Sequence, residues 1–306
     1  LEELTSSNNI DFMERSYVNQ LVPTKKLGVM IHGEPIDNMT YAASVYQNDF
    51  TEVTNQDNNG REVAGRLTYN FGKAMSADSV MHMGVAGTNG KYQTALASST
   101  NTASAASTTT RATIVGFRSE DRGLANIWRA QLGGPLLTTA AYGGTADEPM
   151  TVQKTLGGLE LAYANGPLKV QGEYINAKFD ASTTVSSGSG DVKAYYAEVM
   201  YNLTGEKWSD AYKSGAFGGL KPNSTFTSNG GSGAWQVGLR WSEFDASDVS
   251  VSGTNARTQN SARGNTVTLG LNWLLNPNAR IMLNYAMTKF DSPITPLTGP
   301  SGLFDA

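Results

Sequence analysis

The chain has 306 residues and a formal net charge of −4. This negative balance argues against nucleic acid as a partner, because proteins that bind phosphate backbones present a basic surface. The chain has no cysteine, which excludes disulfide bonds and thiolate metal sites, and no apolar run reaches the roughly 18 residues of a membrane helix.

Aromatic residues are numerous in a chain that is otherwise polar. Hydrophobic residues make up 39% of the sequence, yet 13 Tyr, 10 Phe and 5 Trp are present. A transmembrane barrel has this composition, because its lumen and loops are polar, its lipid face is a thin apolar band, and aromatic girdles mark both interfaces. A secreted β-sandwich is also compatible with the composition, so this observation leaves two classes open.

Apolar and polar side chains alternate with a period of two through most of the chain, which predicts strands. The clearest case is residues 233–245, where Trp235, Val237, Leu239 and Trp241 share one face. The alternation predicts about ten strands of roughly nine to eleven residues, the span that a tilted membrane strand needs. In chain order they are residues 27–33, 39–48, 62–71, 79–87, 155–164, 168–174, 192–203, 233–245, 265–274 and 280–290.

Short and long connections alternate between these strands. The short ones, such as residues 34–38, 165–167 and 275–278, carry Pro, Asn and Gly, as tight turns require. The long ones are polar: residues 49–60, 88–153, 179–191 and 245–264. Short turns on the periplasmic side and long loops outside are typical of outer-membrane barrels.

Two segments need separate interpretation. Residues 111–118, RATIVGFR, have a strand pattern, but a single extra crossing would break the alternation of sides. We therefore interpret them as part of an extracellular hairpin. The connection 203–232 lies on the short-turn side although it is long, and it carries Lys207, Lys213 and Lys221. It is either a solvated periplasmic loop or a basic mouth at the pore exit.

Four segments resemble the phosphate-selective porin family, the porin O and P type of Gram-negative outer membranes. They occur in the family's order, and the block LTGE…KSGAFG…KP is the most specific motif; the segments are residues 1–16, 158–174, 201–222 and 265–291. The resemblance implies an all-β transmembrane antiparallel β-barrel of about sixteen strands, with strands preceding and following this chain. It also implies a homotrimer in the cell outer membrane, with a constriction loop folded into the lumen.

The resemblance divides the chain, a single porin barrel domain over residues 1–306, into functional segments. Residues 27–290 supply barrel strands and their loops. The remaining assignments are a constriction loop at 1–26, a long extracellular loop at 88–153, a long periplasmic connection at 203–232 and the last extracellular loop at 291–306.

The resemblance also assigns the pore constriction. Arg15, in the motif FMERS, matches the position where the family has a basic residue facing the permeant anion. A guanidinium suits this role because it is always charged and offers several donors to an oxyanion. Phosphate-binding members have a lysine where this chain has Glu3, and a carboxylate there repels phosphate and partly cancels Arg15. We therefore expect weak anion preference, with phosphate or other oxyanions as candidate solutes.

Other charged residues are assigned by strand phase or by the family match. Lys213 and Lys221, and less closely Lys207, match basic positions that the family uses to draw anions toward the periplasmic exit. The polar phase of the strands is expected to face the lumen, and it carries Arg66, Lys169, Glu173 and Arg240, with Glu160 and Glu198. Such rows often pair across neighbouring strands, and we favour this structural interpretation for Glu160 and Glu198.

Catalysis, metals and cofactors are not expected. His32 and His82 are isolated, and the Asp/Asn-rich loop 47–59 lacks the spacing of a calcium loop. No phosphate-binding glycine loop or Ser-His-Asp arrangement stands out. Three functions stay open: a passive diffusion channel for small hydrophilic solutes, a porin-like scaffold for adhesion or surface interaction, and a secreted soluble β protein that binds carbohydrate. For the channel, the expected partners are outer-membrane lipid, lipopolysaccharide and small anions.

Overall fold

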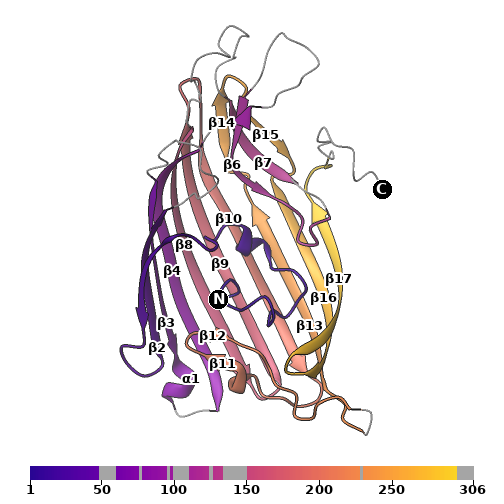
Figure 1. Ribbon diagram of the computed structural model, residues 1–306. Coiled ribbons are helices and arrows are strands. Elements are labelled where there is room, and N and C mark those ends of the chain that lie inside the picture. The colour runs from indigo at the N-terminus through magenta and orange to yellow at the C-terminus, as the bar shows by residue number, and fades with distance from the viewer. Residues whose placement is uncertain are drawn as a thin grey trace.

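The computed structural model describes residues 1–47, 60–75, 78–94, 97–98, 110–123, 127–133, 150–227 and 230–294. Ten strands pair antiparallel in one curved wall (Figure 1). Their order along the wall is their order in the chain, so each strand pairs with its neighbour in sequence within this set. The strands are β1 (Gly28–Gly33), β2 (Met39–Gln47), β3 (Arg61–Asn70), β4 (Ser79–Thr94), β8 (Met150–Asn165), β9 (Leu168–Ser182), β10 (Ser186–Asn202), β13 (Ala234–Asp245), β16 (Arg263–Asn276) and β17 (Ala279–Phe290).

Smaller elements lie at the two ends of this wall. An eleventh strand, β14 (Ser250–Gly253), pairs with β10, and a separate four-stranded sheet has the order β15-β7-β6-β5. Among the described residues no helix is long and apolar enough to cross a membrane. The remaining elements are β5 (Ala97–Ser98), β6 (Thr110–Phe117), β7 (Trp128–Gly133), β15 (Arg257–Asn260), β11 (Tyr212–Lys213), β12 (Ala216–Phe217), α1 (Phe71–Ala74), η1 (Tyr17–Gln20) and η3 (Trp208–Ala211).

All ten predicted strands are present in the wall, which confirms the all-β fold class. The four longest exceed their predicted bounds most: β4, β8, β9 and β10 have 16, 16, 15 and 17 residues. Where these strands extend past the apolar band, the outward face becomes polar or small. On β8 and β9 the buried face there carries apolar side chains such as Val152 and Phe179, so the alternation reverses its phase while backbone pairing continues. The predicted loop 179–191 was therefore too long, because only residues 183–185 separate β9 from β10.

The predicted loop 88–153 was also too long at both ends, because β4 continues to Thr94 and β8 starts at Met150. Residues 111–118 fall largely within β6, which pairs with β5 and β7 rather than with the wall. The hairpin interpretation of this stretch therefore agrees with the strand pairing. Most of the loop 49–60, much of 88–153 and residues 295–306 of the last loop lie outside the described residues.

The outward face of the wall carries an apolar band between two aromatic rows. Val237, Leu239 and Trp241 of β13 are each about 40% exposed, whereas Arg240 between them is 2% exposed. Trp235 stacks on Trp273 at one edge of the band, with ring centroids 5.0 Å apart. At the other edge, ring contacts run from Tyr174 through Tyr195 to Trp241. A band of this kind, flanked by aromatic girdles, is the lipid-facing surface of an outer-membrane barrel.

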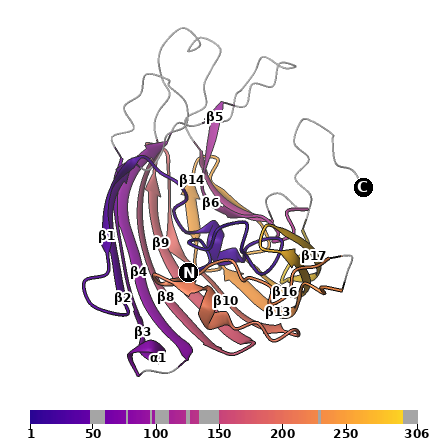
Figure 2. The same ribbon diagram turned by 60° about the horizontal axis from the view of Figure 1, so that its bottom comes forward.

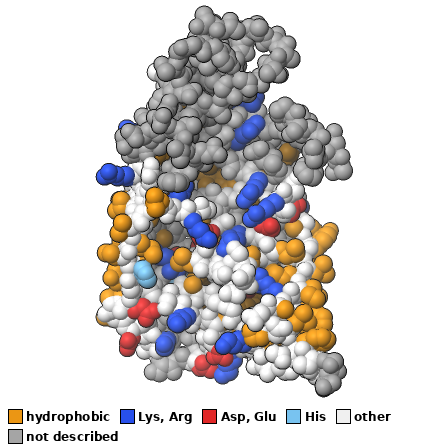
Figure 3. Space-filling model, viewed as in Figure 1, with side chains coloured by type: hydrophobic (Ala, Val, Ile, Leu, Met, Phe, Trp, Pro, Cys, Tyr) orange, Lys and Arg blue, Asp and Glu red, His pale blue; other side chains and the backbone are white. Residues whose placement is uncertain are grey.

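The concave face of the wall is covered by the N-terminal segment and the β6–β7 hairpin. Figure 2 shows the N-terminal segment with η1 inside the curve of the wall. Tyr17 and Val18 of η1 are buried there with Phe117 and Trp128 of the β6–β7 hairpin and with Phe244 of the wall. In Figure 3, hydrophobic side chains gather along the two sides of the molecule and charged ones over its concave centre.

Candidate functional site

Residues 1–26 cross the concave face and are held by the wall at several points. Asn272 donates to the carbonyl of Asp11 over 2.8 Å, and Arg280 donates to the carbonyl of Ile10 over 2.7 Å. The ring of Phe12 packs over Gly270, where an added Cβ would lie 2.9 Å from the ring. A side chain at this position would displace Phe12, so the glycine allows the loop to pack directly on the wall.

A wall arginine, Arg240, links this loop to the β6–β7 hairpin. One terminal nitrogen of its guanidinium lies 3.2 Å from Oε1 of Glu2, and the other lies 3.1 Å from Oε2 of Glu120. The guanidinium also lies over the ring of Phe12, 4.7 Å from its centroid. All three charged side chains are nearly inaccessible to solvent. Such a buried charge set is stable only while every member keeps its partners.

Glu2 and Glu120 each bond the loop as well as the arginine. Both oxygens of Glu2 accept from the backbone nitrogen of Ser16, at 3.0 and 3.1 Å, and its Oε2 also accepts from the Ser16 hydroxyl. Oε1 of Glu120 accepts from the backbone nitrogen of Tyr17 at 3.1 Å. Burial raises the pKa of the Glu2 carboxyl to about 7, although Arg240 and Ser16 act to lower it. The Glu2 carboxyl is thus poised between its neutral and charged forms near neutral pH.

The segment that follows β6 in the β6–β7 hairpin binds the loop. Gln20 and Arg118 exchange two hydrogen bonds of 3.0 Å, and Arg122 lies 2.5 Å from a carboxylate oxygen of Glu14. Phe117 stacks on Phe244 of the wall with centroids 4.3 Å apart. These contacts join the hairpin and the N-terminal loop into one packed unit on the concave face of the wall.

The predicted constriction pair, Arg15 and Glu3, lies together in the loop. Nε of Arg15 is 3.8 Å from Oε2 of Glu3, and Glu3 also accepts a hydrogen bond from Asn19. Arg15 donates to the carbonyls of Thr5 and Glu2 and to the hydroxyl of Ser7. Its side chain is 16% exposed. The guanidinium thus braces the loop and keeps a small solvent-accessible surface.

The wall residues assigned by strand phase lie on the concave face with partners nearby. Arg66 donates to both oxygens of Glu160, at 2.8 and 2.6 Å, and Lys169 pairs with Asp11 and with Glu198, the latter at 3.7 Å. These pairs neutralise most of the positive charge that the polar phase carries.

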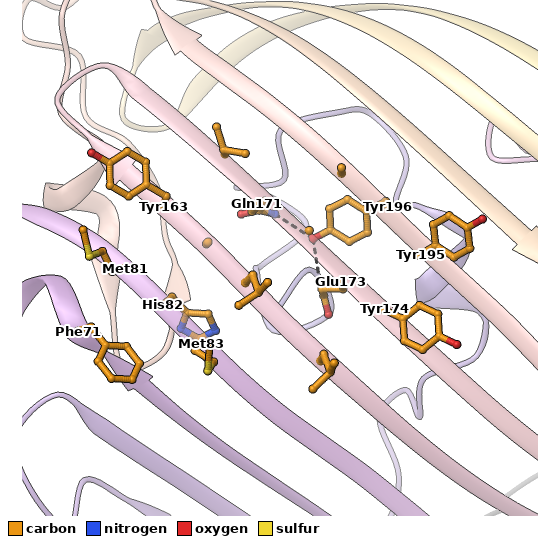
Figure 4. Close-up of a pocket in the computed structure, with 16 residues that line it drawn as sticks. Phe71, Met81, His82, Met83, Tyr163, Gln171, Glu173, Tyr174, Tyr195 and Tyr196 are labelled. Carbon is orange, nitrogen blue, oxygen red and sulfur yellow. Dashed lines mark hydrogen bonds between the residues drawn. The ribbon is translucent and has the colours of Figure 1, made fainter.

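Glu173 has a different set of partners. It accepts from the backbone nitrogen of Glu2 at 2.6 Å and from the Tyr196 hydroxyl at 2.8 Å. Figure 4 shows this bond to Tyr196 together with Tyr174, the next residue of β9, which belongs to the outward face. Glu173 thus helps to seat the start of the loop on the wall.

The connection 203–232, predicted to be periplasmic, folds back against the wall. In its β11–β12 hairpin, the carbonyl of Gly215 accepts from Arg66 at 2.7 Å, and the hydroxyl of Ser214 donates to Glu34 at 2.7 Å. The hydroxyl of Tyr212 lies 2.7 Å from Nδ1 of His82. Gly215 has a φ of 76° and an added Cβ would lie 2.8 Å from Thr40, so glycine is required at this approach.

The three predicted exit lysines have different surroundings. Lys207 lies 2.9 Å from Asp78, and this hydrogen bond and charge lower the pKa of the Asp78 carboxyl. Both side chains are more than half exposed. Lys213 and Lys221 are exposed and make no ion pair with other described residues. Of the three lysines, Lys213 and Lys221 are therefore the ones whose charge is not neutralised by another described residue.

Sequence reasoning missed Glu2, Glu120 and Asp11, which hold the loop in place. Arg240 and Glu2 are 238 positions apart, and Lys169 and Asp11 are 158 apart. Segments without regular structure have no period that tells which side chains turn inward, so no signal in the sequence could pair these residues. Within the described residues, no group of three or more His, Asp or Glu side chains is arranged to hold a metal ion.

Comparison with known proteins agrees with the geometry. The family model described as "Phosphate-selective porin O and P" matches residues 1–292. Porin O of Pseudomonas aeruginosa is 32% identical over 157 residues, which cover 50% of this chain and 34% of that protein. The chain thus spans about a third of the length of this relative. The lipid-facing band and the family match together show that this chain is part of an outer-membrane β-barrel and belongs to the phosphate-selective porin O and P family.

Proposed function

We propose that the protein is a diffusion channel for small hydrophilic solutes. The observation that carries this proposal is the division of the wall, with an apolar band outside and charged side chains on the concave face. The loop 1–26 narrows the concave space and is braced by buried charge pairs. Charges in a narrow, low-dielectric passage focus the field and filter ions. The alternative of a secreted soluble carbohydrate-binding protein fails, because the side chains of Leu239 and its outward neighbours are not packed in a core.

Weak anion preference is the selectivity that the charges support. The wall cations Arg66, Lys169 and Arg240 are paired with carboxylates and contribute little net charge. The accessible part of Arg15 is opposed by Glu3, while Lys213 and Lys221 stay unpaired among the described residues. Phosphate and other oxyanions are candidate solutes because the relative's family is described as phosphate-selective. We further propose a homotrimer as the working assembly.

Conductance in a planar bilayer tests the channel proposal. The purified full-length protein is expected to insert as a trimer and to give discrete current steps in KCl. A trimer that inserts but gives no steps would contradict the channel and would leave surface interaction as the remaining role. Cross-linking in detergent before the measurement reports the assembly independently of the current.

Selectivity should change in opposite directions when Arg15 and Glu3 are altered. Arg15→Ala removes the loop cation and is expected to shift the reversal potential in a KCl gradient toward cation preference. Glu3→Lys is expected to raise the anion-to-cation permeability ratio by about twofold, a modest part of what focused charge can do. Arg263→Ala is the matched control, because Arg263 pairs with Asp245 on the outward face. An unchanged reversal potential in Arg15→Ala would show that Arg15 is not in the ion path.

A further inference from the structure

The outward face of the wall becomes polar directly above its extracellular aromatic row. On β9, Tyr174 is followed on the same face by Asn176, Lys178, Asp180 and Ser182. Lys178 lies four residues beyond Tyr174, about 13 Å along the strand at 3.3 Å per residue. A strand tilt of about 40° reduces this to about 10 Å in height. Aromatic girdles mark the edge of the hydrocarbon, so this surface lies at the level of lipid head groups.

Strand register brings a shallow polar groove together at this level. Lys91, Gln153, Asp180, Ser189 and Ser250 are successive cross-strand partners on β4, β8, β9, β10 and β14. They line a groove of ≈ 440 Å³. The next row of the same groove supplies four more hydroxyls, from Thr151, Ser182, Ser187 and Ser252. The groove thus offers many hydroxyl groups with a cation at one rim.

A second cation lies beside the groove. Arg61 of β3 is the direct cross-strand partner of Lys91, and both side chains are exposed. Like charges directly opposite each other in a sheet are destabilising, and an anion between them removes this cost. Neither residue makes an ion pair with other described residues, and the same is true of Lys178 in the row below.

Farther along the wall, in a row of cross-strand partners nearer the apolar band, the exposed cations are paired. There Lys193 lies 3.2 Å from Asp248, and Arg263 lies 2.6 Å from Asp245. These cations are satisfied by carboxylates of the chain itself. Unpaired cations on β3, β4 and β9 therefore adjoin a hydroxyl-lined groove that extends over β8, β9, β10 and β14, which distinguishes this part of the surface from a uniformly charged rim.

We infer that this surface binds the phosphorylated sugar head group of an outer-leaflet glycolipid, that is, lipopolysaccharide. Arg61 and Lys91 form charge-assisted hydrogen bonds to a phosphate. The serine and threonine hydroxyls and Gln153 bond the sugar hydroxyls, and Asp180 accepts from one of them. The inference rests on the outer-membrane location of the protein and is independent of whether its lumen conducts.

Binding of purified lipopolysaccharide to the full-length protein in detergent tests the inference. The double variant R61Q/K91Q is expected to bind about tenfold more weakly than the unaltered protein, because two charge-assisted bonds are lost. The same lipid with its phosphates removed is expected to bind the unaltered protein as weakly. The control variant K193Q/R263Q also removes two cations from the outward face and should bind like the unaltered protein.

The outcomes distinguish lipid binding from other roles of this surface. Equal binding by R61Q/K91Q and the unaltered protein would overturn the inference, as would an equal loss in K193Q/R263Q. If R61Q/K91Q instead dissociates the trimer without changing lipid binding, the surface is a contact between protomers and the inference is wrong. Single-channel conductance of R61Q/K91Q should stay unchanged, because both residues lie outside the lumen. Failure of the channel proposal can therefore be distinguished from failure of this inference.

Discussion

Arg240→Met is expected to release the N-terminal loop and to change the pore more than any other single substitution of the concave face. It leaves Glu2 and Glu120 buried without their shared cation, and breaking a buried ion pair by removing one partner costs about 3–5 kcal/mol. Burial already raises the pKa of Glu2 to about 7 despite Arg240, so without the guanidinium this carboxyl should become neutral. Single-channel recording is expected to show larger and noisier current steps, and thermal unfolding should occur at a lower temperature.

Two further variants show whether the cation or only its packing matters. Arg263→Met removes an arginine that is half exposed on the outward face and pairs with one carboxylate, so it should leave the current unchanged. Combining Arg240→Met with Glu2→Gln and Glu120→Gln removes the stranded charges and should restore part of the lost stability. Steps as quiet as those of the unaltered protein in Arg240→Met would show that these ion pairs do not hold the loop.

Leu239→Arg is expected to impair insertion into the membrane. Leu239 lies within the apolar band, between its cross-strand partners Val199 and Leu269, and its side chain is 43% exposed. An arginine on the lipid face near the midplane of the bilayer costs about 2–4 kcal/mol. The free energy of unfolding from lipid vesicles should fall by about that amount.

The same substitution at Leu203 is the control for this prediction. Leu203 is 57% exposed and follows β10 at the edge of the apolar band, where its backbone nitrogen donates to the carbonyl of Trp235. Leu203→Arg should cost about 1 kcal/mol or less, because the penalty vanishes near the interface. Equal losses at both positions would mean that the outward face does not contact hydrocarbon at Leu239.

The wall was predictable from the sequence because each strand residue faces one of two environments. Alternation at Leu239 and Arg240 predicted two different faces of β13, and Leu239 is exposed whereas Arg240 is buried; the same reasoning found every strand of the wall. It failed where the strands extend past the apolar band. On β10, Ser187 and Ser189 face outward there and the other face carries Ser186 and Gly188, so pairing continues without a hydropathy signal. On β9 the buried face carries Phe179 and the outward face Asp180, so the apolar phase is reversed.

The contents of the lumen were less predictable. Strand phase alone placed Arg240 on the concave face, but its partners Glu2 and Glu120 come from segments without regular periodicity. Family resemblance indicated that residues 1–26 form an inward loop, and it drew attention to Arg15 and Glu3. The buried ion pairs that fasten the loop depend on long-range packing, which only the folded chain reveals.

Site-directed spin labelling tests the division between lipid and water most directly, because the chain has no native cysteine to remove. Single cysteines at Val237 and Leu239, and at Gln236 and Ser242, can be labelled in reconstituted protein. The account predicts that labels at 237 and 239 collide with oxygen dissolved in the lipid, whereas those at 236 and 242 do not. Equal oxygen accessibility at all four positions would contradict a wall with lipid on one face and a solute path on the other.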